Sequence, residues 1–205
     1  MTELQRKYDF LVVGAGMAGA SIGAELAAHG SVLVIEMEDQ PGYHATGRSV
    51  AFWTETYGGP GVQPLTSASG PLLHNPDPAF SDMSFLSPRG TLHIGTQAEV
   101  DAREQMIDSF AGAGVEFHRL DEQALHTRIA GLCPEYSIGL AEPSTSDIDV
   151  AALHAAYLAL LRRRGGDVIT RSALQGAERI SGGDWQVTTT GGIFAAGLLI
   201  NAAGA

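Results

Sequence analysis

The stretch from Asp9 to Glu36 decides the fold. It reads Asp9-Phe-Leu-Val-Val-Gly14-Ala-Gly16-Met-Ala-Gly19, then an alanine-rich run, then Ser31-Val-Leu-Val-Ile-Glu36. The order is an apolar strand, a glycine-rich turn, a helix, a second apolar strand and an acid. This spacing of glycines is typical of dinucleotide-binding βαβ units. It predicts a parallel α/β sheet and a ligand that contains an ADP group.

Each part of this pattern has a physical role. Gly14 permits the tight turn, Gly16 lets the backbone approach a pyrophosphate, and Gly19 lets the helix pack closely on the strands. The helix N-terminus offers unpaired N–H groups, which suit a diphosphate. Glu36 is placed to accept hydrogen bonds from ribose hydroxyls, and its charge disfavours a 2′-phosphate. The alternative is a buried βαβ unit without a ligand; we set it aside because all flanking elements are in register.

Composition narrows the class of protein. The 205 residues suffice for one large domain or two small ones, and 44% hydrophobic with 17% charged residues are globular values. A net charge of −11 disfavours nucleic acid or an anionic membrane as a partner. Cys133 is the only cysteine, so no internal disulfide is possible. The chain has no apolar signal region and no apolar run long enough to span a membrane, so we expect a cytoplasmic protein.

Periodicity beyond the first βαβ unit predicts a mixed order of elements. We expect helices over 18–29, 65–73, 97–112 and 150–164 and a short helix capped by Asp121. Residues 139–149 read as polar and turn-rich. Strands are expected over 115–119, 167–170, 174–180 and 185–190, and from 193 onward, with Gly-rich hairpin turns between the last of them.

Four further segments narrow the ligand class. They are Gln40-Pro-Gly-Tyr-His-Ala-Thr-Gly-Arg-Ser49, Leu86-Ser-Pro-Arg89, Asp147-Ile-Asp149 with the helix after it, and Asn201-Ala-Ala-Gly-Ala205. Together with the glycine-rich turn they resemble the FAD-dependent amino-acid oxidoreductases of the D-amino-acid oxidase superfamily, and most nearly those of the D-arginine dehydrogenase type. The resemblance runs along the whole chain.

The resemblance implies an α/β fold. A Rossmann-like FAD-binding domain, with a parallel sheet plus an antiparallel meander, is expected over residues 1–80 and 148–205. Residues 81–147 are expected to be part of an inserted α+β substrate domain. In this family the arginine that binds the substrate carboxylate comes after the Asn-Ala-Ala-Gly motif, so the chain is expected to be an N-terminal portion.

The resemblance also implies FAD as the cofactor and assigns site residues. Tyr57 and Thr54 are the expected catalytic residues, and Tyr57 and Thr91 the expected substrate-binding ones. Ordinary core packing of the aromatic 52–57 segment and a solvated 45–49 loop are the competing interpretations. The seven histidines show no metal-ligand spacing and read as ordinary surface or partly buried residues, so no metal is expected. The expected cofactor contacts are Gly14, Ala15, Gly16, Ala18, Gly19, Glu36, Met37, Ala45, Thr46, Gly47, Arg48, Ser49, Phe52, Ala173 and Gly204.

Two positions depart from the D-arginine dehydrogenase pattern. Phe52 replaces a histidine, so any hydrogen bond made by that ring is absent. Thr91 stands where those enzymes have a glutamate that pairs with the cationic substrate. Loss of a desolvated charge partner costs about 2–5 kcal/mol. The sequence therefore predicts a preference for neutral or smaller amino acids over D-arginine.

The family's reaction is oxidation of the Cα–N bond of an amino acid to an imine, which hydrolyses to a 2-oxo acid. The expected partner is a small amino acid or amine, and the electron acceptor is unknown. Three alternatives stay open: a fragment that at most holds the ADP part of FAD, another amine or hydroxy-acid oxidoreductase of the superfamily, or an NAD-dependent dehydrogenase. NAD is disfavoured because it needs neither the 45–49 loop nor the meander.

Overall fold

The computed structural model describes residues 4–204, which divide into two compact units. The first unit comprises the chain up to Val50 together with the chain from Val150 onward. The second unit is the continuous segment Ala51–Asp149. The sequence-based boundary at residue 80 is therefore corrected: residues 51–80 pack with the second unit, because Trp53 donates to the carbonyl of Thr66 at 2.9 Å and its ring lies against Gly70.

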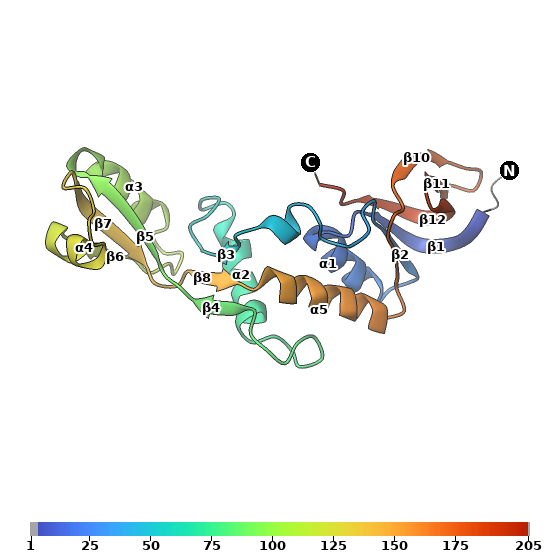
Figure 1. Cartoon of the computed structure of the whole chain (residues 1–205), viewed down its shortest axis with the longest axis horizontal. Helices are drawn as coiled ribbons and strands as arrows, with labels where there is room; N and C mark the ends of the chain where they lie inside the picture. The colour runs from blue at the N-terminus through green and yellow to red at the C-terminus, as the bar shows by residue number, and fades with distance from the viewer. Residues whose placement is uncertain (1–3, 205) are drawn as a thin grey trace. The chain divides into compact units, whose positions relative to one another are not determined.

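The first unit is built on a six-stranded sheet in the order β10-β11-β12-β1-β2-β9 (Figure 1). Its strands β12, β1, β2 and β9 are parallel, and β10 and β11 are antiparallel additions at one edge. This confirms the expected Rossmann-like sheet with an antiparallel meander. The strands are β1 (Leu4–Val13), β2 (Val32–Ile35), β9 (Asp167–Ile169), β10 (Leu174–Arg179), β11 (Trp185–Thr189) and β12 (Gly192–Asn201).

Helices α1 (Met17–Leu26) and α5 (Val150–Arg163) pack on the same face of this sheet. Val12, Val34 and Leu161 belong to the apolar cluster between helices and strands. Helix α1 ends three residues earlier than its periodicity predicts. Gly30 does not adopt the positive φ expected of a helix-ending glycine; the Asp9 side chain packs against it instead, and a Cβ there would lie 2.8 Å from the Asp9 carboxylate. Gly165, with φ +85°, does end α5 as expected.

The second unit contains two three-stranded antiparallel sheets. One has the order β3-β8-β4, and the other β5-β7-β6 (Figure 1). Their strands are β3 (Phe52–Trp53), β4 (Leu86–Pro88), β5 (Thr91–Thr96), β6 (His118–Leu120), β7 (Tyr136–Glu142) and β8 (Ser146–Ile148). The helices are α2 (Gln63–His74), α3 (Val100–Ser109) and α4 (Glu122–Arg128), and short 3₁₀ turns occupy Thr46–Arg48 in the first unit and Gln97–Glu99 in the second.

Two expectations for the second unit were wrong. Residues 139–149 are not a turn-rich stretch, because β7 and β8 occupy most of them and each is the central strand of its sheet. Their pairing partners lie far away in the sequence, so no local pattern revealed them. The helix expected over 97–112 ends at Ser109. Asp121 caps α4 as expected and accepts a hydrogen bond from the amide of Ala124 at 2.8 Å.

Candidate functional site

The glycine-rich turn is closed so tightly that only glycine fits at two of its positions. Gly14 has φ +97°, and a Cβ there would lie 2.5 Å from the carbonyl oxygen of Ala202. A Cβ on Gly19 would overlap the carbonyl oxygen of Gly14. Gly16 is the N-cap of α1, and a Cβ there would lie 3.2 Å from the hydroxyl of Thr46. The first turn of α1 is therefore held against the ends of β1 and β12.

Glu36 follows β2 and is 7% exposed. Its carboxylate accepts the amide of Ala15 through Oε2 and the amide of Glu38 through Oε1, each at 3.0 Å. An ionised carboxylate offers about four acceptor positions, so about two remain for the hydroxyls of a ribose. Glu36 thus has two functions: it ties the glycine-rich turn to β2, and it retains acceptor capacity at the place where a ribose is expected.

The 45–49 loop lies against the start of α1. Thr46 accepts the amide of Met17 through its hydroxyl at 3.0 Å, and Gly47 donates to the carbonyl of Gly42 at 2.7 Å. Arg48 stacks on the ring of Tyr43, 4.8 Å from its centroid. Ala45 and Ser49 are exposed in the same loop. The predicted contact loop therefore borders the glycine-rich turn, although the two are separated by more than a helix and a strand.

These groups fit the diphosphate of a dinucleotide. Within residues 4–204, the amides of Gly16, Ala18 and Gly19 have no acceptor in the chain. Unpaired amides at the N-terminus of a helix, together with a turn that lacks side chains, favour a bound diphosphate. Arg48 supplies a guanidinium in the neighbouring loop, and guanidinium groups bind phosphate well.

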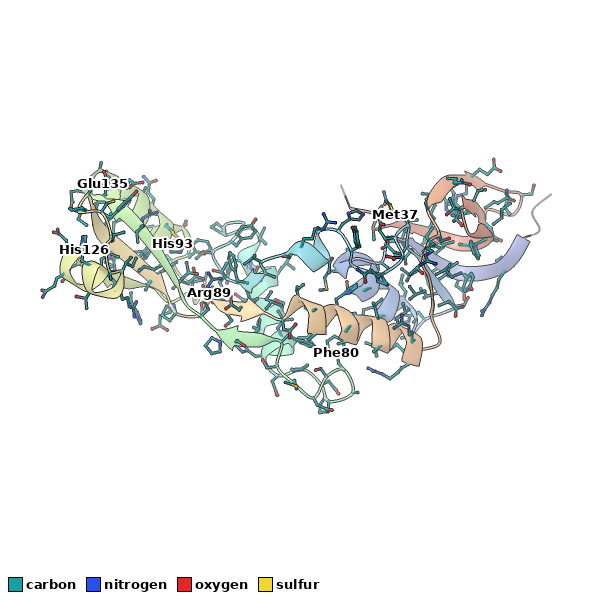
Figure 2. All side chains as sticks on the ribbon, viewed as in Figure 1. Met37, Phe80, Arg89, His93, His126 and Glu135 are labelled. Carbon is teal, nitrogen blue, oxygen red and sulfur yellow. The ribbon has the colours of Figure 1, made fainter. Side chains whose placement is uncertain are left out.

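Three other predicted cofactor contacts, Met37, Ala173 and Gly204, differ in the groups that they can offer to a ligand. Met37, which is labelled in Figure 2, follows Glu36 in the chain. It is 59% exposed. The amide of Ala173 donates to the hydroxyl of Thr190, and the carbonyl of Ala173 accepts the amide of Thr190, each at 2.9 Å. Only the second lone pair of this carbonyl is therefore left for the adenine base of the cofactor. Gly204, with φ +85°, follows the residues that pack against Gly14.

The predicted substrate residues come together in the second unit. A pocket of about 430 Å³ is bordered by Tyr57, Thr54, Thr91 and Phe52, which the sequence singled out for cofactor or substrate. Arg89, His93, Thr56, Gly58 and Met106 complete its lining. Arg89 and His93 are labelled in Figure 2. Four of the pocket residues were therefore singled out by the sequence, three from the 52–57 segment and one, Thr91, from a separate stretch.

Glu142 lies beside this pocket, was not predicted, and is 0% exposed. Its carboxylate accepts the hydroxyls of Thr54 and Thr56, each at 2.7 Å, and the amide of Glu55 at 3.1 Å. Burial raises the pKa of Glu142, but His93 and these hydrogen bonds lower it more, so the pKa lies below its usual range. A buried, ionised carboxylate thus anchors the segment that carries Tyr57.

This network changes the role of Thr54. Its hydroxyl donates to Glu142 and accepts from Thr145 at 3.2 Å, and it is only 7% exposed. Thr54 therefore has little left to offer a substrate. Tyr57, which is 75% exposed, and Thr91 remain available.

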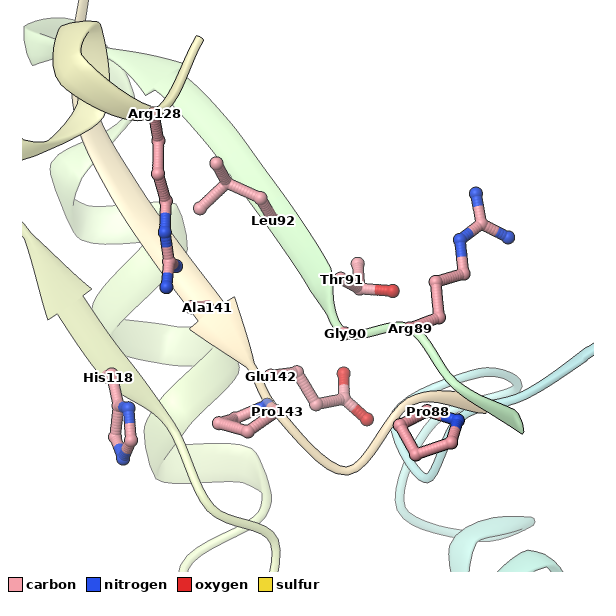
Figure 3. Close-up of a pocket in the computed structure, with 10 residues that line it drawn as sticks. All are labelled: Pro88, Arg89, Gly90, Thr91, Leu92, His118, Arg128, Ala141, Glu142 and Pro143. Carbon is pink, nitrogen blue, oxygen red and sulfur yellow. The ribbon is translucent and has the colours of Figure 1, made fainter. Parts of the chain in front are cut away.

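Glu142 lies directly opposite Thr91 on the neighbouring strand, as Figure 3 shows. A carboxylate is thus present next to the position where D-arginine dehydrogenases carry theirs, but its oxygens are turned to the 54–56 segment and not to solvent. His93 follows Thr91 by two residues on β5, and its Nε2 lies 3.6 Å from Oε2 of Glu142. Nothing local in the sequence marks Glu142 except that it is an acid ending an apolar strand.

A second pocket, of about 540 Å³, lies around the start of β5. Leu92, Ala141 and His118 are in register across the three strands, so their side chains share one face, and Arg128 borders the same pocket (Figure 3). His93 and Leu140 alternate to the other face. No sequence-predicted residue other than Thr91 lines this pocket.

The fold is that of a two-unit protein: a Rossmann-like unit whose glycine-rich turn suits a dinucleotide, and an inserted unit that carries a pocket of small-molecule size. A model of the DAO family, described as FAD dependent oxidoreductase, matches residues 9–205, and the chain belongs to this family. FAD is the family's cofactor, as the sequence predicted.

Relatives of known activity differ in substrate. L-2-hydroxyglutarate dehydrogenase from Escherichia coli is 25% identical over 96% of this chain and 47% of its own length. Glycine oxidase from Geobacillus kaustophilus has the same fold, with a TM-score of 0.85, 21% identity and coverage of 98% of this chain and 56% of that one. FAD-bound L-α-glycerophosphate oxidase from Mycoplasma pneumoniae also has a TM-score of 0.85, with 16% identity and coverage of 97% and 54%.

The chain spans about half the length of the curated relatives it matches. None of the helices described over residues 4–204 is long and apolar enough to cross a membrane. In the same residues, no group of three His, Cys, Asp or Glu side chains is placed to hold a metal ion.

Proposed function

We propose that the protein oxidises a small carboxylic acid at its Cα, where the carbon carries an amino or a hydroxyl group, and that a strongly cationic amino acid is a poor substrate. The family supports oxidation with FAD. When bound, FAD supplies the acceptor for the hydride that leaves the substrate Cα. Among amino acids we place the D-series first, because the 40–49 and 86–89 segments resemble D-arginine dehydrogenases.

One observation carries the substrate class. The pocket of the second unit is lined by hydroxyls, an imidazole, a guanidinium and apolar groups, and by no carboxylate with free acceptor positions. Glu142, the acid next to it, is fully buried and already accepts three hydrogen bonds. A cationic side chain placed there would lose its water without gaining an ion pair, which is unfavourable.

Tyr57 and Thr91 are the residues that we assign to the substrate. Tyr57 presents an exposed ring and hydroxyl at the pocket, and Thr91 presents a hydroxyl at the start of β5. Both can donate to and accept from an uncharged polar group. Phe52 contributes an apolar wall beneath the Arg89 guanidinium, which lies 5.4 Å from the ring centroid.

A 2-hydroxy acid with a second carboxylate is the other candidate. Arg89 borders the pocket, and its contact with Asp147 at 3.0 Å is an exposed ion pair. Exposed pairs contribute only about 0–1 kcal/mol, so a ligand carboxylate can replace Asp147. The curated relative named for L-2-hydroxyglutarate supports this option.

The test is a substrate panel on the FAD-loaded protein without oxygen, with bleaching of the flavin absorbance as the readout. Neutral D- and L-amino acids, glycine, D-arginine and 2-hydroxyglutarate are compared. We expect D-arginine to reduce the flavin at least about tenfold less efficiently than the best neutral substrate or 2-hydroxyglutarate. Replacement Thr91→Glu should raise the relative efficiency of D-arginine, and Thr91→Val should not. If D-arginine is preferred by the unchanged protein, the proposed substrate class is wrong.

A second experiment tests whether the 205-residue chain binds FAD by itself. We expect the 205-residue chain to bind FAD in near-equimolar amount, seen as a yellow product. Binding of ADP without FAD would instead support the alternative that the chain holds only the ADP part of the cofactor.

A further inference from the structure

A histidine that was expected to be ordinary lies under the glycine-rich turn. His154 belongs to the second turn of α5 and is only 8% exposed. Its Nε2 lies 2.8 Å from the carbonyl oxygen of Ala15. A carbonyl oxygen can only accept, so Nε2 carries the hydrogen and donates it. This hydrogen bond joins two segments 139 residues apart in the chain.

The ring is enclosed on its other side by the loop that precedes Thr46. Gly42 has φ +76°, and a Cβ there would lie 2.9 Å from Cε1 of His154. The carbonyl of Gly42 accepts the amide of Gly47, and Thr46 accepts the amide of Met17. His154 therefore lies between the two backbone segments that border the diphosphate site.

The hydrogen bond has a directional consequence. In a trans peptide the C=O of one residue and the N–H of the next point in opposite directions, and the described chain has no cis peptide. The carbonyl of Ala15 points to His154, so the amide of Gly16 in the same peptide unit points away from α5. This is one of the three amides at the start of α1 that have no acceptor within residues 4–204. The other side of Ala15 is fixed independently, because its own amide donates to Glu36.

We propose that His154 is a positioning residue for FAD: by donating to the Ala15 carbonyl, it holds the Gly16 amide in the orientation that binds the diphosphate. It does not contact the cofactor itself. The proposal depends on the family's cofactor and not on the substrate class proposed above. A change of substrate assignment would leave it unaffected.

The experiment measures dissociation constants of FAD, ADP and adenosine for the 205-residue chain, by flavin fluorescence and by ligand-observed NMR. His154→Leu removes the donor and leaves the Ala15 carbonyl unpaired, so we expect FAD and ADP to bind about tenfold more weakly or worse. Adenosine lacks the diphosphate, and its affinity should change less than threefold. General loss of structure would weaken all three ligands alike.

His154→Gln is the rescue variant. The amide nitrogen of glutamine is the same number of bonds from Cα as Nε2 of histidine, so it can donate to the same carbonyl. We expect its ADP affinity to lie within about threefold of the unchanged chain. The asparagine side chain is one bond too short, so His154→Asn should behave like His154→Leu. If His154→Leu does not fold, the ADP affinities of His154→Gln and His154→Asn test the proposal instead.

His126→Leu is the matched control, since His126 also donates to a carbonyl, that of Tyr136 at 3.1 Å, but in the second unit. It should leave ADP affinity unchanged. Three results would overturn the proposal: ADP affinity of His154→Leu within threefold of the unchanged chain, equal weakening of ADP and adenosine, or glutamine no better than asparagine. Failure of the unchanged chain to bind either ADP or FAD would overturn it as well.

Discussion

Glu142 holds an ionised carboxylate in the interior of the second unit, surrounded by hydroxyls of one distant segment. The charge is tolerated because three donors and the nearby His93 replace the water it has lost. The same donors fix the position of the segment that leads to Tyr57. At the scale of single residues, the lining of the pocket therefore depends on a buried acid that already accepts three hydrogen bonds from the chain.

We predict that Glu142→Gln lowers the free energy of unfolding by about 1–3 kcal/mol at pH 7, because the hydroxyl donors lose a charged acceptor. The folded-state pKa of Glu142 is depressed. Its contribution is therefore complete above the unfolded-state pKa of about 4.3 and is lost as the pH falls through the folded-state value. Urea unfolding should show the difference between the two proteins shrinking below about pH 4.3.

The control for this change is Glu116→Gln, since Glu116 is exposed and pairs with the exposed His118. It should change stability by less than about 0.5 kcal/mol at either pH. A constant difference between Glu142→Gln and the unchanged protein from pH 7 to pH 3 would contradict the role of the charge.

A second prediction concerns Gly19. An alanine there would place its Cβ on the carbonyl oxygen of Gly14, which belongs to the backbone and cannot rotate away. We expect Gly19→Ala to lower the free energy of unfolding by about 1–3 kcal/mol and to abolish measurable FAD binding. Gly176→Ala, where no atom lies within 4 Å of the added Cβ, serves as the control and should retain FAD binding. Fluorescence titration of FAD measures both.

At the scale of elements, α1 lacks a side-chain cap of its own. Its N-cap is Gly16, which has no side chain, and the hydroxyl of Thr46 from a separate loop accepts the amide of Met17 instead. The cap is thus supplied by the loop that also borders the diphosphate site. We therefore expect binding of the cofactor and stability of the first turn of α1 to depend on the same contact.

We predict that Thr46→Val removes this cap and lowers the free energy of unfolding by about 1 kcal/mol. FAD affinity should fall as well, since the loop loses its anchor to the helix. Thr127→Val is the control: its hydroxyl donates to a carbonyl within α4 at 2.8 Å and is exposed. Thermal unfolding with and without FAD measures both effects, and equal FAD affinity of Thr46→Val and the unchanged protein would contradict the prediction.

At the scale of the whole molecule, the second unit is an insertion whose two ends meet. Ile148 donates its amide to the carbonyl of Ala51 at 3.0 Å, and β3 pairs with β8 directly beyond it. The first unit has its own sheet, and its helices α1 and α5 pack on each other. The two units therefore need not share a core.

We predict that replacing residues 51–149 with a short Gly/Ser linker leaves a folded first unit, because the ends of the deleted segment are adjacent. Circular dichroism should show a cooperative thermal transition, and the ADP dissociation constant should stay within about tenfold of that of the whole chain. A product without a cooperative transition would show that the second unit is needed for the first to fold.

Local sequence determined the βαβ start, the meander, the start of α4 and the ends of α5. In these elements strand patterns, turn glycines and caps act over a few residues, so periodicity and turn chemistry are sufficient. The loop around Thr46 and the pocket residues Phe52, Tyr57 and Thr91 were predicted through resemblance to a family. The strands of the second unit were predicted least accurately, because β7 and β8 pair with strands far away in the chain.

Sequence by itself predicted a dinucleotide site at the glycine-rich turn, since that turn is built from a contiguous stretch, and resemblance to a family narrowed the dinucleotide to FAD. Only the tertiary structure decided that Glu142 lies opposite Thr91 and is already occupied, and that His154 supports the carbonyl of Ala15. The physical reason is distance along the chain. An isolated acid or histidine carries no local pattern, and its chemistry is fixed by the partners that folding brings to it.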